Sequence, residues 1–303
     1  MAIVYAEITF CFANFFYWMQ IVIMKTPFHK SLAFTFFLLV ILSCVPTQAQ
    51  KDQFVHSKIL NFAKRVFQKD PGVAFGGLPK PAHYPNKITV LDKGDFIIGY
   101  DEVRECPVWV VYKVTPDDDY LAPKRPSHFE TDYATVAKVR HEDYTHSGYD
   151  RGHLAPNFAI ASRYGNTAQI ETFKMSNVAP QKPGLNRGLW KELEMLEALK
   201  DGYGDHLNTV WLICGCIWDN DKTFVAGKIE IPDAFFKIII DLVDGEPRVM
   251  GFVMPQIPPK KYLANYLKSV DEIEFLSHLD VMSELEDAIE NDIESKQAEE
   301  LWK

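Results

Sequence analysis

Two short segments of this chain combine the residue types needed to hydrolyse a phosphodiester. The first, Ser147–Asn157, places Asp150, Arg151 and His153 within four residues. Arginine offers a planar fork of donors that matches phosphate oxygens, and histidine takes up a proton near neutral pH. Gly152 allows a backbone conformation that larger residues resist. This pattern predicts attack of water on a phosphodiester; the alternative is a buried Asp150–Arg151 ion pair beside an incidental histidine.

The second segment, Ser176–Glu194, holds Asn186, Trp190 and Glu194 at steps of four residues. On one continuous helix, Asn186 and Glu194 would lie two turns and about 80° apart, on broadly the same face. A neutral amide oxygen is a suitable ligand for Mg²⁺, and a carboxylate two turns away can orient the waters of that ion. The alternatives are a helix cap for Asn186 and core packing for Trp190, and core packing is favoured for Trp190.

The elements around these segments predict a single α+β domain. Apolar runs rich in β-branched and aromatic residues predict strands, and they lie at residues 88–92, 96–100, 106–114, 209–218, 235–242 and 248–254. Helical periodicity predicts helices at residues 52–69, 186–200, 262–267 and 271–302. Residues 115–147 are polar and predict a long surface loop. Such loops in compact domains are usually functional.

Composition and charge leave a polyanionic partner possible. The 303 residues are 47% hydrophobic and 24% charged, which is typical of a globular protein. Taken alone, the formal net charge of −9 disfavours binding to phosphates. However, residues 271–303 alone carry a net charge of −10, the first fifty residues carry +1, and the rest of the chain is neutral. A basic cleft is therefore still permitted, and the acidic segment is expected to be a solvated helix that repels nucleic acid.

The first fifty residues are expected to form a leader rather than part of the fold. A short basic region opens at Met24, an apolar run covers residues 32–45, and small residues allow cleavage after Ala49. This pattern predicts a secretory signal and an exported, periplasmic or secreted protein. Residues 1–23 lack a positive start and indicate an upstream extension from a misplaced start codon. Lipidation at Cys44 is a variant of this prediction, and no stable membrane span is expected in the mature chain.

Three cysteines would remain after cleavage of the leader: Cys106, Cys214 and Cys216. An odd number leaves at least one thiol free or in an intermolecular bridge. The Cys-x-Cys pair lies in a strongly apolar segment, and no second pair of metal ligands appears at a suitable spacing. Core packing is therefore favoured over a zinc site.

Several spaced motifs together resemble the DNA/RNA non-specific endonucleases of the ββα-metal (His-Me finger) class. They are Asp150-Arg-Gly-His153, Asn177-x-x-Pro-Gln181, Leu185-Asn186, Trp190 and Glu194, with further likeness at Gly99–Tyr112, Ile231–Lys237 and Ser269–Glu274. The resemblance covers roughly residues 75–285 and is far more specific than one tetrapeptide. It implies an α+β fold in which helices pack on a central antiparallel sheet.

The resemblance also implies a role for each matching residue. His153 would be the general base, and Asn186 would be the sole direct protein ligand of one Mg²⁺, with Mn²⁺ or another divalent cation able to substitute. The other implied roles are for Glu194 to hold metal-bound waters, for Arg151, Asn177 and Arg125 to contact substrate, and for Asp150, Gly152 and Trp190 to support the site. Arg187 or Lys191 could add positive charge, although solvated helix residues are favoured there.

The sequence thus predicts an exported, Mg²⁺-dependent endonuclease that hydrolyses DNA and RNA to 5′-phosphate products and recognises the phosphate backbone. The expected division is a leader at 1–49, a helix and linker at 50–90, the nuclease domain at 91–285 and an acidic helical tail at 286–303. Two alternatives stay open: a phosphodiesterase acting on nucleotides or other small esters, and an inactive nucleic-acid-binding relative. The oligomeric state is left open.

Overall fold

The computed structural model describes residues 72–116, 121–199, 202–207, 209–219 and 221–302. The chain divides into two units, Met1–Ser57 and Lys58–Lys303, and all of these residues belong to the second unit. The leader, Cys44 and the helix expected at residues 52–69 lie outside the described residues. Within the described part of the chain, no helix is both long and apolar enough to cross a membrane.

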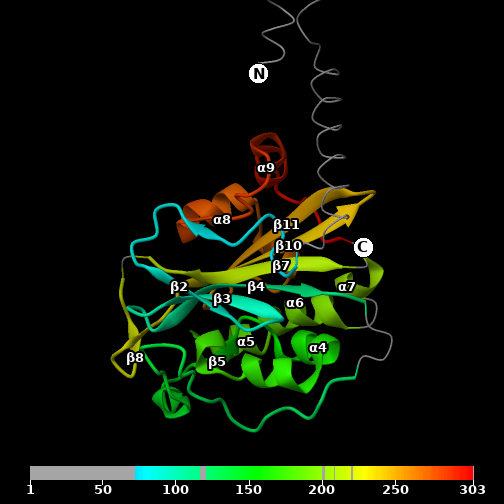
Figure 1. Cartoon of the computed structure of the whole chain (residues 1–303). Helices are drawn as coiled ribbons and strands as arrows, with labels where there is room; N and C mark the ends of the chain where they lie inside the picture. Colours follow the sequence, from blue (N-terminus) through cyan, green and yellow to red (C-terminus); the bar gives the residue numbers. More distant parts are fainter. Residues whose placement is uncertain (1–71, 117–120, 200–201, 208, 220, 303) are drawn as a thin grey trace, which may run out of the picture. The chain divides into compact units, whose positions relative to one another are not determined.

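A seven-stranded antiparallel sheet forms the centre of the fold, in the order β12-β11-β10-β7-β4-β3-β2 (Figure 1). Its strands are β2 (Ile88–Asp92), β3 (Phe96–Asp101), β4 (Cys106–Val114), β7 (Val210–Ile217), β10 (Ala234–Val243), β11 (Glu246–Pro255) and β12 (Leu267–Lys268). The six strands expected from sequence are all present. The predicted domain boundary after residue 90 is wrong, because it falls inside β2, which pairs with β3.

The central strands β4 and β7 are almost entirely apolar, because both faces of the sheet are covered. All eight residues of β7 are buried, and so is every residue of β4 except Lys113. The tight hairpin between β10 and β11 turns at Asp244 and Gly245, whose φ angles are 53° and 84°. Both angles lie in the left-handed region that Asp and Gly tolerate best.

Two groups of elements cover opposite faces of the sheet (Figure 1). On one face lie α4 (Asn157–Thr172), α5 (Pro183–Asn186) and α6 (Leu189–Ala198), with the hairpin of β5 (Asp150–His153) and β6 (Val178–Gln181). On the other lie α8 (Val270–Ser277) and α9 (Asp287–Glu294). The remaining short elements are β1 (Lys80–Pro81), η1 (His141–Tyr144), η2 (Met175–Asn177), α7 (Tyr203–His206), β8 (Phe224–Val225), β9 (Ile229–Glu230), η3 (Leu263–Tyr266) and β13 (Leu279–Asp280).

The helix expected at residues 186–200 is two helices, because the chain breaks between α5 and α6. Gly188 caps α6 with φ −105° and ψ −115°, outside helical geometry. A Cβ atom at this position would lie 2.4 Å from the carbonyl oxygen of Gly184, so only glycine fits the break. Asn186 and Glu194 therefore lie on different helices, and the angle calculated for one continuous helix does not apply.

The acidic C-terminal segment is not the single solvated helix expected from its charge. It forms α8, β13 and α9 in turn, and β13 pairs with β1. Apolar side chains between the acids are buried, including Ile273, Val281, Ile289 and Ile293. These residues pack within the same unit as the sheet, so the tail predicted at residues 286–303 is part of the folded domain.

Cys106 of β4 and Cys214 and Cys216 of β7 are buried and carry free thiols. The thiol of Cys214 donates to the carbonyl oxygen of Leu154, 3.2 Å away. The expected core-packing role therefore agrees with their place in the central strands.

Candidate functional site

The Asp150–His153 motif forms β5, the first strand of a β-β-α unit. It pairs antiparallel with β6, so that Asp150 faces Gln181 and His153 faces Val178. At Gly152 a Cβ atom would lie 2.5 Å from Oε1 of Gln181. Glycine is needed here because the Gln181 side chain lies too close to the backbone for any larger residue. The expectation that Gly152 needs an unusual backbone conformation is wrong, because its φ is not positive.

His153 is a buried imidazole held between two aromatic rings. Its side chain lies 4.9 Å from the ring of Phe129 and 5.0 Å from that of Phe173, measured between ring centroids. The backbone carbonyl of His153 accepts a hydrogen bond from Nε1 of Trp190 at 3.4 Å. Burial, and then the charge of Arg125, lower the pKa of His153 to about 3. The ring is therefore neutral at physiological pH, and its buried Nε2 has no partner among the described residues.

Asn186, the last residue of α5, is fixed by Asp150. Its Nδ2 donates to Oδ2 of Asp150 at 2.9 Å, which leaves the amide oxygen available to a ligand. Arg187 makes two further bonds to the same carboxylate, from Nε at 2.7 Å and from Nη2 at 2.6 Å. Burial works to raise the pKa of Asp150, but the hydrogen bonds from Arg187 and Asn186 outweigh it and lower the pKa. Asp150 thus acts as an ionised support.

Glu194 lies half-buried on α6, above a buried polar network that was not predicted from sequence. Burial raises the pKa of Glu194 to about 7, although the charge of Lys237 opposes this. Beneath it, Lys237 of β10 binds Glu197, and both contact the hydroxyl of Tyr112. Burial alone would lower the pKa of Lys237, but the charge of Glu197 outweighs it and the pKa is raised. The signal for this network was a lone lysine inside the apolar segment Phe235–Ile240.

These residues meet in one cavity of about 750 Å³. The imidazole of His153, the amides of Asn157 and Asn186 and the carboxylate of Glu194 form part of its walls. The positive side chains in its walls are those of Arg125, Arg151, Arg187 and Lys191. Arg125 is exposed on the long loop and stacks over the ring of Phe173 at 5.2 Å. A neutral imidazole, an amide, a carboxylate and positive side chains therefore line one cavity, where they can act together on a phosphate group.

Two of the predicted substrate-contacting residues have side chains that bind the protein's own backbone. Arg151 lines the cavity, but its guanidinium donates to the carbonyl oxygen of His141 and lies 5.6 Å from the ring of Tyr144. Asn177 is fully buried and its side chain bonds only to backbone groups of Ala155 and Thr172, so it does not line the cavity. The expected substrate contact at Asn177 is wrong. Its amide instead fixes the chain that follows His153.

Trp190 packs in the core, as favoured from sequence. Its side chain is fully buried, with its ring 5.6 Å from that of Phe235. The Nζ atom of Lys237 lies 4.8 Å from the Trp190 ring. Trp190 therefore packs α6 against the core and holds the end of β5, where His153 lies.

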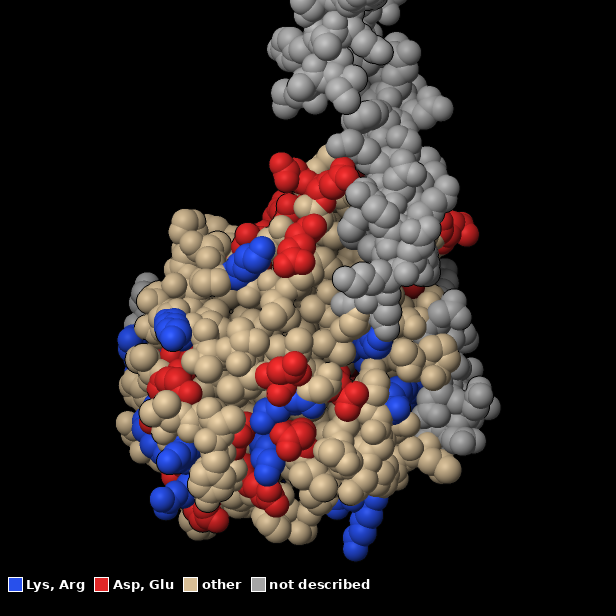
Figure 2. Space-filling view, in the orientation of Figure 1, with Lys and Arg blue, Asp and Glu red and all other residues tan. Residues whose placement is uncertain are grey.

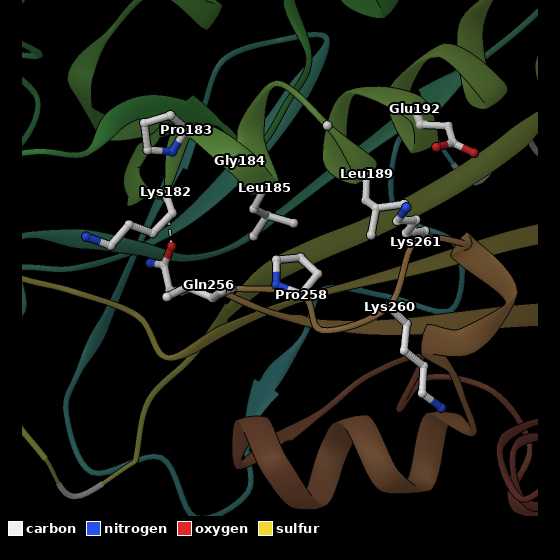
Figure 3. A pocket seen from close by; sticks show the side chains of 12 residues that line it. Lys182, Pro183, Gly184, Leu185, Leu189, Glu192, Gln256, Pro258, Lys260 and Lys261 are labelled. Atoms are coloured by element: carbon white, nitrogen blue, oxygen red, sulfur yellow. Dashed lines mark hydrogen bonds between the residues drawn. The ribbon is translucent and has the colours of Figure 1, made fainter.

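A second cavity, of about 560 Å³, lies against the same two helices (Figure 3). Its walls come from α5, α6 and the segment after β11, and they include Lys182, Lys260 and Lys261. The backbone N–H of Lys182 donates to Oε1 of Gln256 at 2.8 Å, which ties α5 to that segment. Three lysines thus lie beside the helices that carry Asn186 and Glu194.

Comparisons with known proteins show the family of this chain. Residues 79–288 match the model of the DNA/RNA non-specific endonuclease family. The chain is 30% identical to mitochondrial endonuclease G of Bos taurus, over 69% of this chain and 75% of that protein. It is 29% identical to a nuclease of Nostoc sp., over 70% and 81% of the two chains.

A solved structure of an EndoG/EndoGI complex contains a chain similar to this one. The two superpose with a TM-score of 0.58 and 24% sequence identity, over 67% of this chain and 89% of that one. The match confirms the α+β fold of a ββα-metal nuclease, with helices packed on a central antiparallel sheet. This chain, with its β-β-α unit and the cavity above it, therefore belongs to the DNA/RNA non-specific endonuclease family.

Proposed function

We propose that this protein is a divalent-metal-dependent endonuclease that hydrolyses phosphodiester bonds of DNA and RNA without base specificity. The observation that carries the proposal is the buried, unpartnered Nε2 of His153, in a side chain that lines the same cavity as Asn186 and Glu194. The lowered pKa keeps the imidazole neutral at the pH where the enzyme would work, and a neutral imidazole has a ring nitrogen that can accept a proton from water.

The chain's own residues prepare this step before substrate binds. Phe129 and Phe173 hold the ring plane of His153, and the indole N–H of Trp190 holds its backbone carbonyl. His153 takes the proton as water attacks phosphorus. Arg125 lies at the cavity with its guanidinium unneutralised by any ion pair among the described side chains, so it can contact the phosphate and stabilise the charge that develops there.

The donor set fits a hard divalent cation such as Mg²⁺. Asn186 offers an amide oxygen held in place by Asp150, and Glu194 is a carboxylate at the cavity wall. Asn186 would bind the ion directly and Glu194 would orient its waters. When bound, the metal would supply positive charge beside the scissile phosphate and the leaving 3′ oxygen, which favours 5′-phosphate products; Mn²⁺ is expected to substitute.

The positive side chains around the site suit a polymer rather than a small ester. Arg125 and Lys191 line the catalytic cavity. Lys182, Lys260 and Lys261 line the second cavity, which also borders α5 and α6 (Figure 3). Phosphates along a strand can contact such groups without base readout. We therefore expect cleavage of long substrates to weaken as salt rises.

Incubation with plasmid DNA and with RNA tests the proposal. Both polymers should be degraded with Mg²⁺ and stay intact with EDTA. His153→Ala should lower the rate by about 10²–10⁴-fold, while His128→Ala, on the exposed loop that also carries Arg125, should leave it unchanged. Intact polymers would reject the endonuclease. Cleavage of a small phosphodiester in the same assay would then favour the phosphodiesterase alternative.

The leader supports a further proposal, that the protein is exported to the periplasm or secreted. The basic start after Met24, the apolar run at residues 32–45 and the small residues ending at Ala49 are typical of a cleaved signal. N-terminal sequencing of the exported chain should find Gln50 first. A lipid-modified chain starting at Cys44 would replace secretion by anchoring, and an uncleaved chain inside the cell would reject export.

A further inference from the structure

Three carboxylates meet on the face of the sheet opposite the catalytic cavity. Asp271 and Glu274 lie on α8, and Glu294 is the last residue of α9. Both helices lie on the other side of the sheet from α4, α5 and α6 (Figure 1). Residues of these three helices line the cavity of His153. This acidic triad therefore cannot take part in the chemistry at His153.

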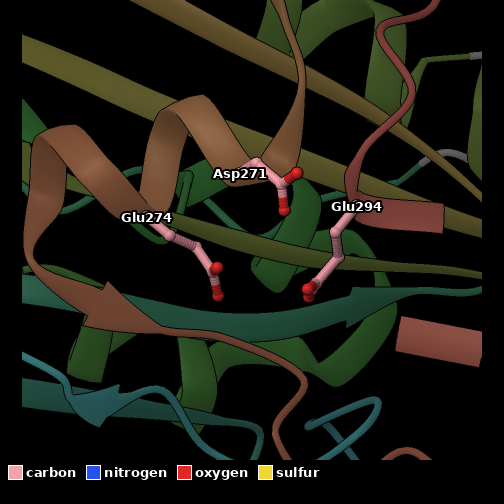
Figure 4. A group of neighbouring side chains, drawn as sticks. All are labelled: Asp271, Glu274 and Glu294. Atoms are coloured by element: carbon pink, nitrogen blue, oxygen red, sulfur yellow. The ribbon is translucent and has the colours of Figure 1, made fainter. Parts of the chain in front are cut away.

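The triad has the geometry of a ligand set. One oxygen from each of the three carboxylates lies within 4.8 Å of the other two. Figure 4 shows the carboxylate ends of Glu274 and Glu294 directed toward the space between α8 and α9, with Asp271 beside them. The exposure of the three is graded: Asp271 is exposed, Glu274 is half-buried and Glu294 is 4% exposed. A small ion could thus be reached from solvent and be held against the protein interior.

An independent observation marks Glu294 as incomplete. Its Oε1 is buried and has no hydrogen-bond partner among the described residues. In the part of the chain that the structure describes, neither lysine nor arginine forms an ion pair with any member of the triad. A buried carboxylate without a partner is costly, and a bound cation would remove that cost.

The surroundings add negative charge rather than neutralising it. Burial is the largest cause of the raised pKa of Glu294, which is about 9. The pKa is raised further by the negative charges of Glu274, Glu290, Asp271 and Asp280. Acidic side chains also gather over α9 at the top of the view in Figure 2. Glu294 lies at the C-terminal end of its helix, where the helix dipole further favours a cation.

We propose that Asp271, Glu274 and Glu294 bind a divalent cation, and that Ca²⁺ is the ion that fits best. All three ligand atoms are hard oxygens, which excludes a preference for softer metals. Calcium accepts six to eight oxygens at about 2.3–2.6 Å, so ligands on opposite sides of it lie about 5 Å apart, close to the span of the triad. Water at the open side of Asp271 would complete its shell. Magnesium requires shorter and more regular contacts.

The bound ion would join α8 to α9. Other contacts already order the site: Oε1 of Glu274 accepts the backbone N–H of Val281 at 2.7 Å, just after β13. The ion would therefore hold α9 against α8 within the acidic C-terminal segment. Its effect would be on stability and not on the reaction at His153.

Calcium titration of the chelator-stripped full chain tests the proposal. It is best done in the Asn186→Ala background, so that the catalytic metal site does not contribute. We expect one Ca²⁺ per chain by isothermal titration calorimetry, with Mg²⁺ bound at least tenfold more weakly. Adding Glu294→Gln should abolish this binding or weaken it at least a hundredfold, and adding Glu290→Gln, an acid on the same helix outside the triad, should change it less than threefold.

A second readout uses thermal unfolding of the same proteins. Saturating Ca²⁺ should raise Tm by several degrees in the Asn186→Ala protein and not after Glu294→Gln. Asp271→Asn, on the exposed rim, offers a variant that does not disturb the core and should also lose the shift. Absence of Ca²⁺ binding, equal binding by the Glu294→Gln protein, or equal affinity for Mg²⁺ would overturn the proposal; the first result would mean that the buried carboxylate is simply protonated.

Discussion

The buried imidazole of His153 should make the protein unusually sensitive to acid. Its pKa is lowered from 6.5 to about 3, chiefly by burial, and only 8% of the residue is exposed. Between these two pH values the unfolded chain binds a proton at this position and the folded chain does not. Stability is therefore lost as the pH falls through that window. From pH 7 to pH 4, His153 alone should lower the free energy of unfolding by about 3 kcal/mol.

His153→Gln removes this titration and permits a direct measurement. Urea unfolding, followed by tryptophan fluorescence at pH 7 and at pH 4, gives the free energy lost on acidification for each protein. The wild type should lose about 3 kcal/mol more than the variant, since all other titrating groups are shared. The difference between the two losses isolates the histidine.

A packing variant of the same hairpin controls for simple weakening. Val178 faces His153 across the β5–β6 pair and is 1% exposed. Val178→Ala should lower stability by about 1–3 kcal/mol at both pH values and leave the acid loss unchanged. If wild type and His153→Gln lose the same stability between pH 7 and pH 4, the imidazole is not kept neutral by its burial, and the reasoning about the base fails.

Three other substitutions test the supports of the site. Gly152→Ala should cost about 1–3 kcal/mol in urea unfolding, because its Cβ would lie 2.5 Å from Oε1 and 2.8 Å from Cβ of Gln181; adding Gln181→Gly, which removes both atoms, should cost less than the sum of the two single changes, and an additive loss would contradict the steric reason. Lys237→Met should lower the free energy of unfolding by about 3–5 kcal/mol, because it leaves Glu197 buried without its partner. The double variant with Glu197→Leu should be more stable than the Lys237→Met protein. Asp150→Ala should raise the Mg²⁺ concentration for half-maximal cleavage about 10–100-fold with little change in Tm; an unchanged requirement would show that the metal-binding amide does not depend on this support.

The strands of the sheet were predicted well because their own apolar residue types indicate that they are buried. β4 and β7 are continuous apolar runs, and such runs need no knowledge of their neighbours. The motif spacing also predicted which residues line the cavity, namely His153, Asn186 and Glu194. The helix geometry used to join the last two was wrong, because the backbone of Gly188, at φ −105° and ψ −115°, leaves helical geometry between α5 and α6.

A local break in one helix and contacts between distant residues account for what was missed. The helix α4 was not predicted, and Gly165 at φ 82° interrupts its pattern. Lys237 and Glu197 are 40 residues apart in sequence, so no local pattern pairs them. Asn177 has the residue type of a substrate contact, but burial and three backbone hydrogen bonds assign it to the loop after β5.

The free thiols in the centre of the sheet have a consequence for where this enzyme can work. Cys106, Cys214 and Cys216 are buried and uncrosslinked, so the described part of the domain does not rely on an oxidising compartment for its stability. Dithiothreitol should leave its unfolding transition unchanged. The same domain could then fold both in the reducing cytosol and in oxidising surroundings. A cell could not keep the enzyme inactive by keeping its thiols reduced, and would have to control where the protein is sent.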